Sequence, residues 1–334
     1  MSTAAAARFP FARRFDYYHR IFQAYLTRQQ SHLSFWHDTP ELNPNFLPSQ
    51  LGEYYMSFAE KADYAGHYDR RGVPMLDYRG KLGLQYNPIA VAQFGLGNYN
   101  FYHRTQQHGR RNKFITAADW LVSQLEQNTF GVWVWNHNFD WEYRSTLRAP
   151  WYSGLAQGQG ISLLVRAYAA TGNSDYLDAA SRAFHAFLNP VEQGGVSYLD
   201  QFGNLWFEEY VVSPPTHILN GFIWAAWGVY DYFLATRAEI ARRLFLQAVD
   251  TLKANLQRYD LGFWSLYEHS GTHLKMIASP FYHRLHIVQL RVLQRLTGEA
   301  LFGDYAERWE RHYLSRSRRT AAILYKTAFK LCYY

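Results

Sequence analysis

Two hydrophobic patterns divide the chain. Between residues 13 and 28, apolar side chains recur at helical spacing with basic residues between them, which predicts an amphipathic helix. Between Tyr54 and Tyr86, short alternating runs are interrupted by glycine and proline, which predicts strands and turns in a small β-hairpin region. After Asn87-Pro88 the pattern becomes mainly helical. We therefore expect a short β region followed by a large helical domain.

The helical part repeats one plan four times. Each repeat has an aromatic, turn-rich stretch, then a helix of small and apolar residues, a short break, and a more polar amphipathic helix. The apolar helix carries one amide or histidine, which recurs every 61 to 66 residues at Gln93, Gln159, Asn220 and His286. A helix that is apolar all round is buried, and its amphipathic neighbour shields it from water. The predicted fold is therefore mainly α, an α/α toroid in which about four helical hairpins form an incomplete barrel.

This organisation predicts four parts of the chain. They are an N-terminal helical segment (1–50), a β-hairpin region (51–87), an α/α-barrel catalytic domain (88–314) and a basic amphipathic C-terminal tail (315–334). Four aromatic loops precede the apolar helices, at residues 78–88, 132–152, 196–215 and 263–282. All four enter their helices at the same end of the ring, so they converge on one concave face. That face is where a binding site is expected.

Composition and charge narrow the class of partner. Aromatic residues make up 18% of the 334 residues, and such an excess suits a groove for sugars or peptides as well as an aromatic core. The formal net charge of +7 favours a polyanion, which is nucleic acid, an acidic polysaccharide or a membrane surface. Because the chain has no zinc-finger, RNA-recognition or helix-turn-helix signature, we expect no nucleic acid partner.

The two ends of the chain bear on location. The first 14 residues contain no apolar targeting segment, and Cys332 is the only cysteine, so no disulfide framework is possible. These features predict a cytoplasmic protein. The basic tail (315–334) could lie on an anionic surface, at the inner membrane face, or could pack on the domain.

Several kinds of catalytic site are not indicated by the sequence. His283 and His286 are three residues apart, without a zinc-protease pattern or a nearby aspartate cluster, so no metal site is predicted. They are read as substrate contacts or as hydrogen-bonding residues of the core. No Gly-X-Ser-X-Gly elbow is present, and Gly158-Gln159-Gly160 lacks the spacing of a nucleotide-binding loop. We therefore expect acid–base chemistry without a cofactor.

A pair of carboxylates in the third aromatic loop is the main candidate for that chemistry. Glu208 and Glu209 are adjacent, so in an extended loop their side chains point in opposite directions and only one faces the cleft. Glu209 beside Tyr210 could be a general base whose pKa is raised by burial. The alternative is a structural contact between one glutamate and an arginine. A glycosidase would need a second carboxylate, for which spacing does not select among Asp200, Glu208, Glu209 and Glu268.

Several motifs occur together in one order between residues 84 and 314. They are Gln85-Tyr86-Asn87-Pro88-Ile89 with Ala92-Gln93-Phe94-Gly95-Leu96, Trp151-Tyr152-Ser153-Gly154-Leu155-Ala156-Gln157-Gly158-Gln159 with Val165-Arg166-Ala167-Tyr168, Glu208-Glu209-Tyr210 with Leu219-Asn220-Gly221-Phe222, and Tyr282-His283 with His286-Ile287-Val288-Gln289-Leu290. In these motifs the chain resembles the D-glucuronyl C5-epimerases. Those enzymes convert D-glucuronate to L-iduronate within heparosan-type polymers.

The resemblance implies a fold and a catalytic set. The family has an α-helical toroid preceded by β structure, and its animal members suggest a homodimer. Its catalytic glutamate and the following tyrosine match Glu209 and Tyr210, and two later tyrosines match Tyr267 and Tyr282. The chain lacks the long N-terminal region of the animal enzymes, which is consistent with a bacterial, cytoplasmic form.

The resemblance also implies contacts to the substrate. Animal members carry an arginine three residues after the tyrosine that matches Tyr267, and this chain has Ser270 there. The missing positive charge could come from Arg284, His283, Arg144 or Arg148. The residues expected to contact the substrate are Tyr86, Asn87, Gln93, Arg148, Tyr152, Gln157, Gln159, Asn220, His283, Arg284 and His286.

The expected function is inversion of glucuronate at C5 in a heparosan-like acidic glycan. Inversion removes the proton next to the carboxylate and returns one from the opposite face. We expect Glu209, assisted by Tyr210, on one face and Tyr282 on the other, with Tyr267 holding the sugar or its carboxylate. The alternatives are a uronate polysaccharide lyase, which begins with the same proton abstraction, and a non-catalytic protein that binds acidic glycans.

Overall fold

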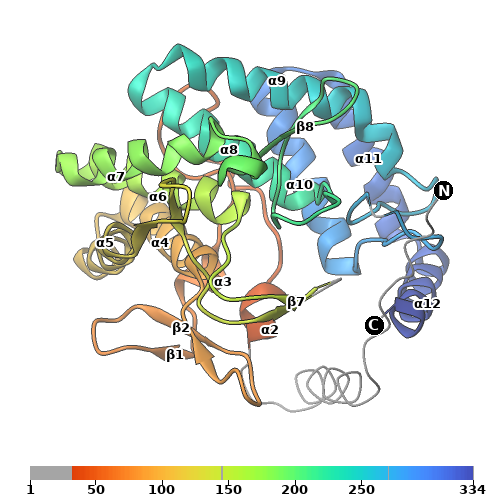
Figure 1. The fold of residues 1–334 in the computed structure, drawn as a ribbon, viewed down its shortest axis with the longest axis horizontal. Helices are drawn as coiled ribbons and strands as arrows, with labels where there is room; N and C mark the ends of the chain where they lie inside the picture. Colours follow the sequence, from red (N-terminus) through yellow and green to blue (C-terminus); the bar gives the residue numbers. More distant parts are fainter. Residues whose placement is uncertain (1–31, 144–145, 270, 334) are drawn as a thin grey trace.

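The computed structural model describes residues 32–143, 146–269 and 271–333 (Figure 1). The helix expected between residues 13 and 28 lies outside these ranges. The described part is mainly helical, with small antiparallel sheets between the helices.

The predicted toroid of four helical hairpins is confirmed. The hairpins follow one another from α4 and α5 at the left of Figure 1 to α10 and α11 at the right. In each pair the first helix is the inner one and the second covers it. The pairs are α4 (Pro88–Thr105) with α5 (His108–Ser123), α6 (Gly154–Thr171) with α7 (Ser174–Phe184), α8 (Leu219–Thr236) with α9 (Glu239–Asn255), and α10 (Pro280–Thr297) with α11 (Ala300–Leu314).

Local sequence explains where three of the inner helices begin. Asn87 caps α4 by accepting hydrogen bonds from the backbone N–H of Ile89 and of Ala90. Ser153 caps α6 and Ser279 caps α10 in the same way. Each cap ends an aromatic loop, so these loops deliver their side chains to the N-terminal end of the ring.

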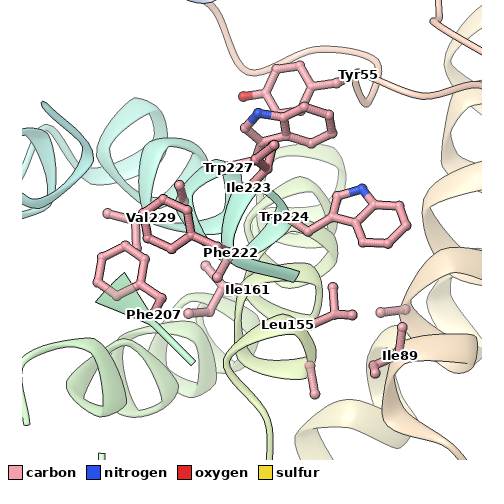
Figure 2. Packing of buried hydrophobic residues seen from close by; sticks show 14 of the residues in the cluster. Tyr55, Ile89, Leu155, Ile161, Phe207, Phe222, Ile223, Trp224, Trp227 and Val229 are labelled. Atoms are coloured by element: carbon pink, nitrogen blue, oxygen red, sulfur yellow. The ribbon is translucent and has the colours of Figure 1, made fainter. Parts of the chain in front are cut away.

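The inner helices α6 and α8 pack closely because glycines face each other. A Cβ added to Gly228 would lie 2.2 Å from the carbonyl oxygen of Gly158, so neither position has room for a side chain. Around this contact the side chains are large and apolar, and Figure 2 shows Phe222 and Trp224 leaving α8 in opposite directions. Phe222 packs in the core, and Trp224 faces a pocket described below.

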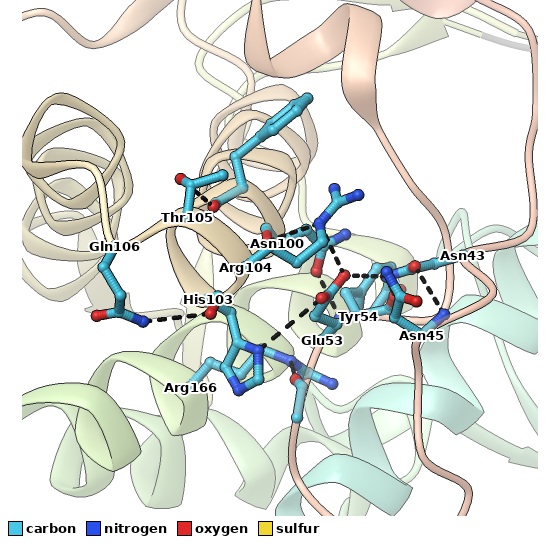
Figure 3. A network of polar contacts seen from close by, with 12 residues as sticks. Asn43, Asn45, Glu53, Tyr54, Asn100, His103, Arg104, Thr105, Gln106 and Arg166 are labelled. Atoms are coloured by element: carbon cyan, nitrogen blue, oxygen red, sulfur yellow. Dashed lines mark hydrogen bonds and ion pairs between the residues drawn. The ribbon is translucent and has the colours of Figure 1, made fainter.

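A buried ion pair joins α6 to α8 within this core. Arg166 donates to the Asp231 carboxylate at 2.7 Å and 3.1 Å, and both side chains are almost fully buried. Tyr55 also donates to Asp231, at 2.7 Å. Beside this pair, Figure 3 shows Glu53 bonded to Asn43 and paired with Arg104 near the end of α4. These contacts attach the segment before α4 to the ring.

The region before α4 differs in detail from the expected hairpin. It contains a three-stranded antiparallel sheet, and the apolar run at residues 54–58 forms only an isolated bridge between Met56 and Leu42. The reason is tertiary packing, because Tyr54 and Tyr55 turn their rings onto Trp227 of the toroid. The elements of this region are α2 (His32–Trp36), α3 (Ala59–Ala62), β1 (His67–Tyr68), β2 (Pro74–Asp77) and β3 (Leu84–Gln85).

Short elements line the aromatic loops between the hairpins. Three two-stranded sheets pair β4 (Leu125–Gln127) with β5 (Trp133–Trp135), β6 (Trp141–Glu142) with β7 (Thr146–Leu147), and β8 (Ser197–Leu199) with β9 (Leu205–Phe207). The 3-10 turns within the described residues are η1 (His185–Phe187), η2 (Val191–Gln193) and η3 (Leu256–Tyr259).

The opening in the incomplete ring, between α4 and α10, is lined by the segment at residues 32–58. Its Tyr54 backbone N–H donates to Asn100 of α4 at 2.6 Å. On the other side, the Arg295 guanidinium of α10 lies 4.0 Å from the ring centre of Phe46. The segment therefore contributes a wall to the ring.

The basic tail forms a helix, α12 (Arg316–Tyr333), that packs on the domain. Ala322 and Phe329 are buried, and Tyr325 accepts a hydrogen bond from the backbone of Lys275. Across residues 32–143, 146–269 and 271–333, no helix has the length and apolar character to span a membrane.

Candidate active site

The four aromatic loops meet in one pocket at the N-terminal ends of the inner helices, as the repeat predicts. Each loop contributes aromatic or polar side chains, and the segment before α4 completes the wall. The residues from the loops and inner helices are Tyr78, Asn87, Ile89, Gln93, Phe139, Trp141, Trp151, Leu155, Glu209, Tyr210, Asn220, Trp224, Phe281, Tyr282 and Leu285.

The two adjacent glutamates point in opposite directions, as expected for an extended loop. Glu208 turns away from the pocket and bonds through its carboxylate to the ring and the backbone N–H of His217. Its backbone is held on both sides, since the Glu208 N–H donates to Val196 and the Gly154 N–H donates to the Glu208 carbonyl. With Glu208 fixed in this way, Glu209 lines the pocket.

Glu209 lies against the start of α8. Asn220 donates to its Oε2 atom at 3.3 Å. A Cβ added to Gly221 would lie 2.1 Å from the same oxygen, so the glycine leaves the space that the carboxylate occupies. Burial raises the pKa of Glu209 to about 8, and the neighbouring Glu268 carboxylate adds to this shift. A carboxyl group of this kind can donate and accept a proton near neutral pH.

Two groups of aromatic rings lie near this carboxylate. Tyr210 packs against Tyr143 at a centroid distance of 4.6 Å and against Trp151 at 5.6 Å. Tyr267 packs edge-on against Tyr282 at 4.9 Å. Burial raises the pKa of Tyr267 well above its usual value, and the Glu209 carboxylate raises it further. Tyr267 is therefore a neutral phenol beside Glu209.

Glu268 is a second carboxylate close enough to act on Glu209, although it does not line the pocket. It is fully buried, it accepts a hydrogen bond from the Tyr143 hydroxyl, and its charge acts on Glu209. The other candidates have different partners. Asp200 caps the turn between β8 and β9 through bonds to Phe202 and Asn204, and Glu208 is bonded to His217.

Polar atoms without a protein partner point to a polar ligand. Among the described residues, Gln93 Oε1, Asn220 Oδ1 and Trp224 Nε1 are buried and make no hydrogen bond. All three residues line the pocket. A buried polar atom without a partner is unfavourable, so these atoms are suited to contact a hydroxyl-rich or carboxylate-bearing molecule.

Four of the predicted substrate contacts have structural roles in place of pocket contacts. Gln157 holds β5 by accepting from the Trp135 N–H and donating to the Trp133 carbonyl, and Gln159 accepts from Gln93. Tyr86 donates to Asp69 on the β side of the domain. Tyr152 packs against the hydrophobic core.

The predicted cationic contacts also lie elsewhere. Arg148 is exposed and pairs with Asp140, and the Arg284 guanidinium lies over the ring of Tyr313. His283 and His286 are buried, and both bond to the Ser265 hydroxyl, so they belong to the core. Arg144 lies outside the described residues. None of these four described side chains lines the pocket, and the core hydrogen bonds of His283 and His286 match one of the two roles predicted for them.

The sequence reasoning missed the wall formed before α4. Trp36, His37, Asp38 and Lys61 line the pocket, and the Lys61 ammonium lies 3.1 Å from the Asp38 carboxylate. The aromatic and charged run from His32 to Asp38 was a signal in the sequence, but nothing local showed that it would dock beside Glu209. In the part of the chain that the structure describes, no group of three or more His, Cys, Asp or Glu is arranged to hold a metal ion.

Comparison with known proteins identifies the family. The protein-family model described as D-glucuronyl C5-epimerase C-terminus matches residues 127–311, which is more than half of the chain. The chain belongs to the D-glucuronyl C5-epimerase family. The matched region contains Glu209, Tyr210, Tyr267 and Tyr282.

Relatives in this family match at modest identity. A D-glucuronyl C5-epimerase of Caenorhabditis elegans is 31% identical over 62% of the chain, and the match spans only 35% of that enzyme. An uncharacterized protein of Methanocaldococcus jannaschii is 31% identical over 61% of the chain and 67% of its own length.

Solved structures match more distantly. A family 76 glycoside hydrolase (mannosidase) from Bacteroides thetaiotaomicron has 11% identity and a TM-score of 0.48, covering 77% of this chain and 69% of its own. The unsaturated glucuronyl hydrolase of Bacillus sp. GL1 has 12% identity and a TM-score of 0.46, covering 67% and 61%.

Proposed function

We propose that the protein is a polysaccharide glucuronate C5-epimerase, an isomerase that converts D-glucuronate to L-iduronate within a heparosan-like acidic glycan. The observation that carries this proposal is the buried Glu209, with its raised pKa, in a pocket with Tyr210 and Tyr282. Membership of the family supports the reaction class, and the polymer is the finer part of the proposal.

The proposed reaction is a proton exchange at one carbon. An ionised base on one face removes the C5 proton, and the electron pair of the C–H bond moves into the uronate carboxylate, giving an enediolate. A proton then returns to C5 from the opposite face, the enediolate reverts to a carboxylate, and the configuration is inverted. No bond of the ring or the glycosidic linkage breaks. Glu209, assisted by Tyr210, serves one face and Tyr282 serves the other.

The enediolate carries more negative charge than the uronate, so the site must supply hydrogen-bond donors or cations to it. Trp224 offers an unpartnered N–H group at the pocket wall, and Tyr267, packed against the pocket residue Tyr282, offers a neutral phenol. Tyr267 is the residue proposed to hold the sugar or its carboxylate.

Exchange of the C5 hydrogen with heavy water, followed by NMR on heparosan, tests the proposal. The wild-type protein is expected to introduce deuterium at C5 and to form iduronate. A lyase would instead expel the group at C4 and leave an unsaturated uronate that absorbs in the ultraviolet. Growth of that absorbance without inversion would replace the epimerase proposal by the lyase. Binding of heparosan without exchange would replace it by a glycan-binding protein.

Three further expectations concern the setting of the enzyme. We propose that the protein is a homodimer and that it is located in the cytoplasm. We also propose that α12 makes peripheral contact with an anionic membrane. Light scattering measures the oligomeric state, and cell fractionation measures the location. Sedimentation with anionic vesicles tests the membrane contact.

A further inference from the structure

The helix α12 turns Lys326 toward the loop that carries Tyr267. Lys326 and Lys330 are one turn apart and lie on the same side of the helix as the buried residues Ala322 and Phe329. The register of this side is fixed, because the hydroxyls of Tyr325 and Tyr333 accept hydrogen bonds from the backbone of residues 275 and 274. The lysine positions therefore follow from the docking of the helix.

The Lys326 ammonium reaches the backbone behind Tyr267. It donates to the Ile277 carbonyl at 2.5 Å and lies 5.5 Å from the centre of the Tyr267 ring, within range of a cation–π contact. Ile277 forms a bridge with Leu266, so the ammonium lies at the segment that presents Tyr267. The positive charge is thus placed on the face of one proposed active-site phenol.

Two charges of opposite sign act on this ammonium. From the loop, Glu268 attracts it, and from its own helix, Lys330 repels it. Burial lowers the pKa of Lys326 to about 7, Lys330 lowers it further, and Glu268 acts in the opposite direction. The Lys326 side chain is only partly exposed, so holding a charge there costs hydration free energy. The ammonium lies between the Ile277 carbonyl and the Tyr267 ring, which brings its charge to the segment that presents Tyr267.

We propose that Lys326 is a positioning residue of the active site, whose positive charge acts through Tyr267 and Glu268 to stabilise the negative charge that develops on the uronate during proton transfer. This inference rests on the proposed function. The site already contains the Glu209 and Glu268 carboxyl groups, and the substrate adds another. Lys326 offsets this charge from behind Tyr267, and α12 is therefore part of the active site.

The test compares three variants in the C5 exchange assay with heparosan. Lys326→Met removes the charge and keeps an unbranched side chain that is one atom shorter. It is expected to lower kcat by about 100-fold, the scale seen when one charge-stabilising group is lost, with a much smaller change in KM. Lys326→Arg keeps the charge and is expected to retain most of the rate. Arg318→Met makes the same change in net charge on the exposed side of α12 and is expected to keep full activity.

Thermal unfolding separates this role from a structural one. Lys326→Met removes a poorly hydrated charge but also the hydrogen bond to the Ile277 carbonyl, so its unfolding temperature should stay close to that of the wild type. If it does not fold, Lys326→Gln takes its place, with the same expected loss of kcat. A neutral variant that folds and keeps the wild-type kcat overturns the inference. A rate lost only together with folding, or equally in Arg318→Met, overturns it as well.

The wild-type reaction distinguishes the two levels of the proposal. If wild-type protein exchanges the C5 hydrogen while the neutral variants do so at the same rate, the inference about Lys326 fails and the epimerase proposal stands. If wild-type protein shows no exchange, both fail.

Discussion

The substitution Glu209→Gln should make the protein inactive and, at alkaline pH, more stable. In the folded protein the pKa of Glu209 is raised from 4.5 to about 8. The folded state therefore holds this proton more tightly than the unfolded chain does. Between pH 4.5 and 8 the folded state binds more protons, so the contribution of Glu209 to stability falls as the pH rises through this window.

The size of the effect follows from the same shift. At pH 7 the unfolded glutamate is ionised and the folded one is mostly protonated, which destabilises the folded state by about 3 kcal/mol. At pH 9 both are ionised, and the penalty reaches about 5 kcal/mol. At pH 5 it is about 1 kcal/mol. A glutamine of the same shape carries none of this penalty.

Urea unfolding at pH 5, 7 and 9 measures the prediction directly. The stability of Glu209→Gln relative to wild type should increase with pH in the steps given above, while C5 exchange falls by about 1,000-fold or more. Glu192→Gln, at an exposed position, makes the same chemical change and should follow the wild-type curve. If Glu209→Gln kept the wild-type pH dependence of stability, the raised pKa and the reasoning built on it would be refuted.

Three other substitutions test separate parts of the account. Tyr282→Phe should still exchange the C5 hydrogen through Glu209 but should form iduronate at least about 100-fold more slowly. NMR of the product measures the deuterium at C5 and the iduronate separately. Gly221→Ala places a Cβ 2.1 Å from Glu209 Oε2 and should lower kcat by about 100-fold through displacement of that carboxylate, as initial rates will show. Asp231→Asn leaves the Arg166 charge buried without its counter-ion and should lower the free energy of unfolding by about 3–5 kcal/mol in urea, while the folded protein keeps its rate.

Periodicity predicted the toroid and the side of the ring that carries the site. Gln93 and Gln159, which the repeat aligns, lie in successive inner helices and bond to each other at 3.0 Å. Equivalent positions of the repeat are therefore neighbours in the folded ring. The alternation of an extended chain likewise predicted that Glu208 and Glu209 would face opposite sides. Both signals are local, so the sequence alone contains them.

The cations near the site could not be predicted in the same way. Arg148 and Arg284 lie within the motif regions, yet Arg148 pairs with Asp140 in an exposed position and Arg284 packs on Tyr313. Lys61 of α3 lines the pocket, and Lys326 of α12 lies behind Tyr267. Both helices lie outside the repeat. Their placement depends on how two distant segments dock, and docking has no local sequence signature.

The segment at residues 32–58, which lies in space between α4 and α10, affects the order in which the parts of the active site form. The helical hairpins are contiguous in sequence, so each can form soon after it leaves the ribosome. One wall of the pocket, however, joins residues 32–58 to α10, and Lys326 follows only with α12. The scaffold can therefore be folded before the catalytic centre exists. Activity should appear last during synthesis, after segments from both sides of the toroid have closed around the pocket.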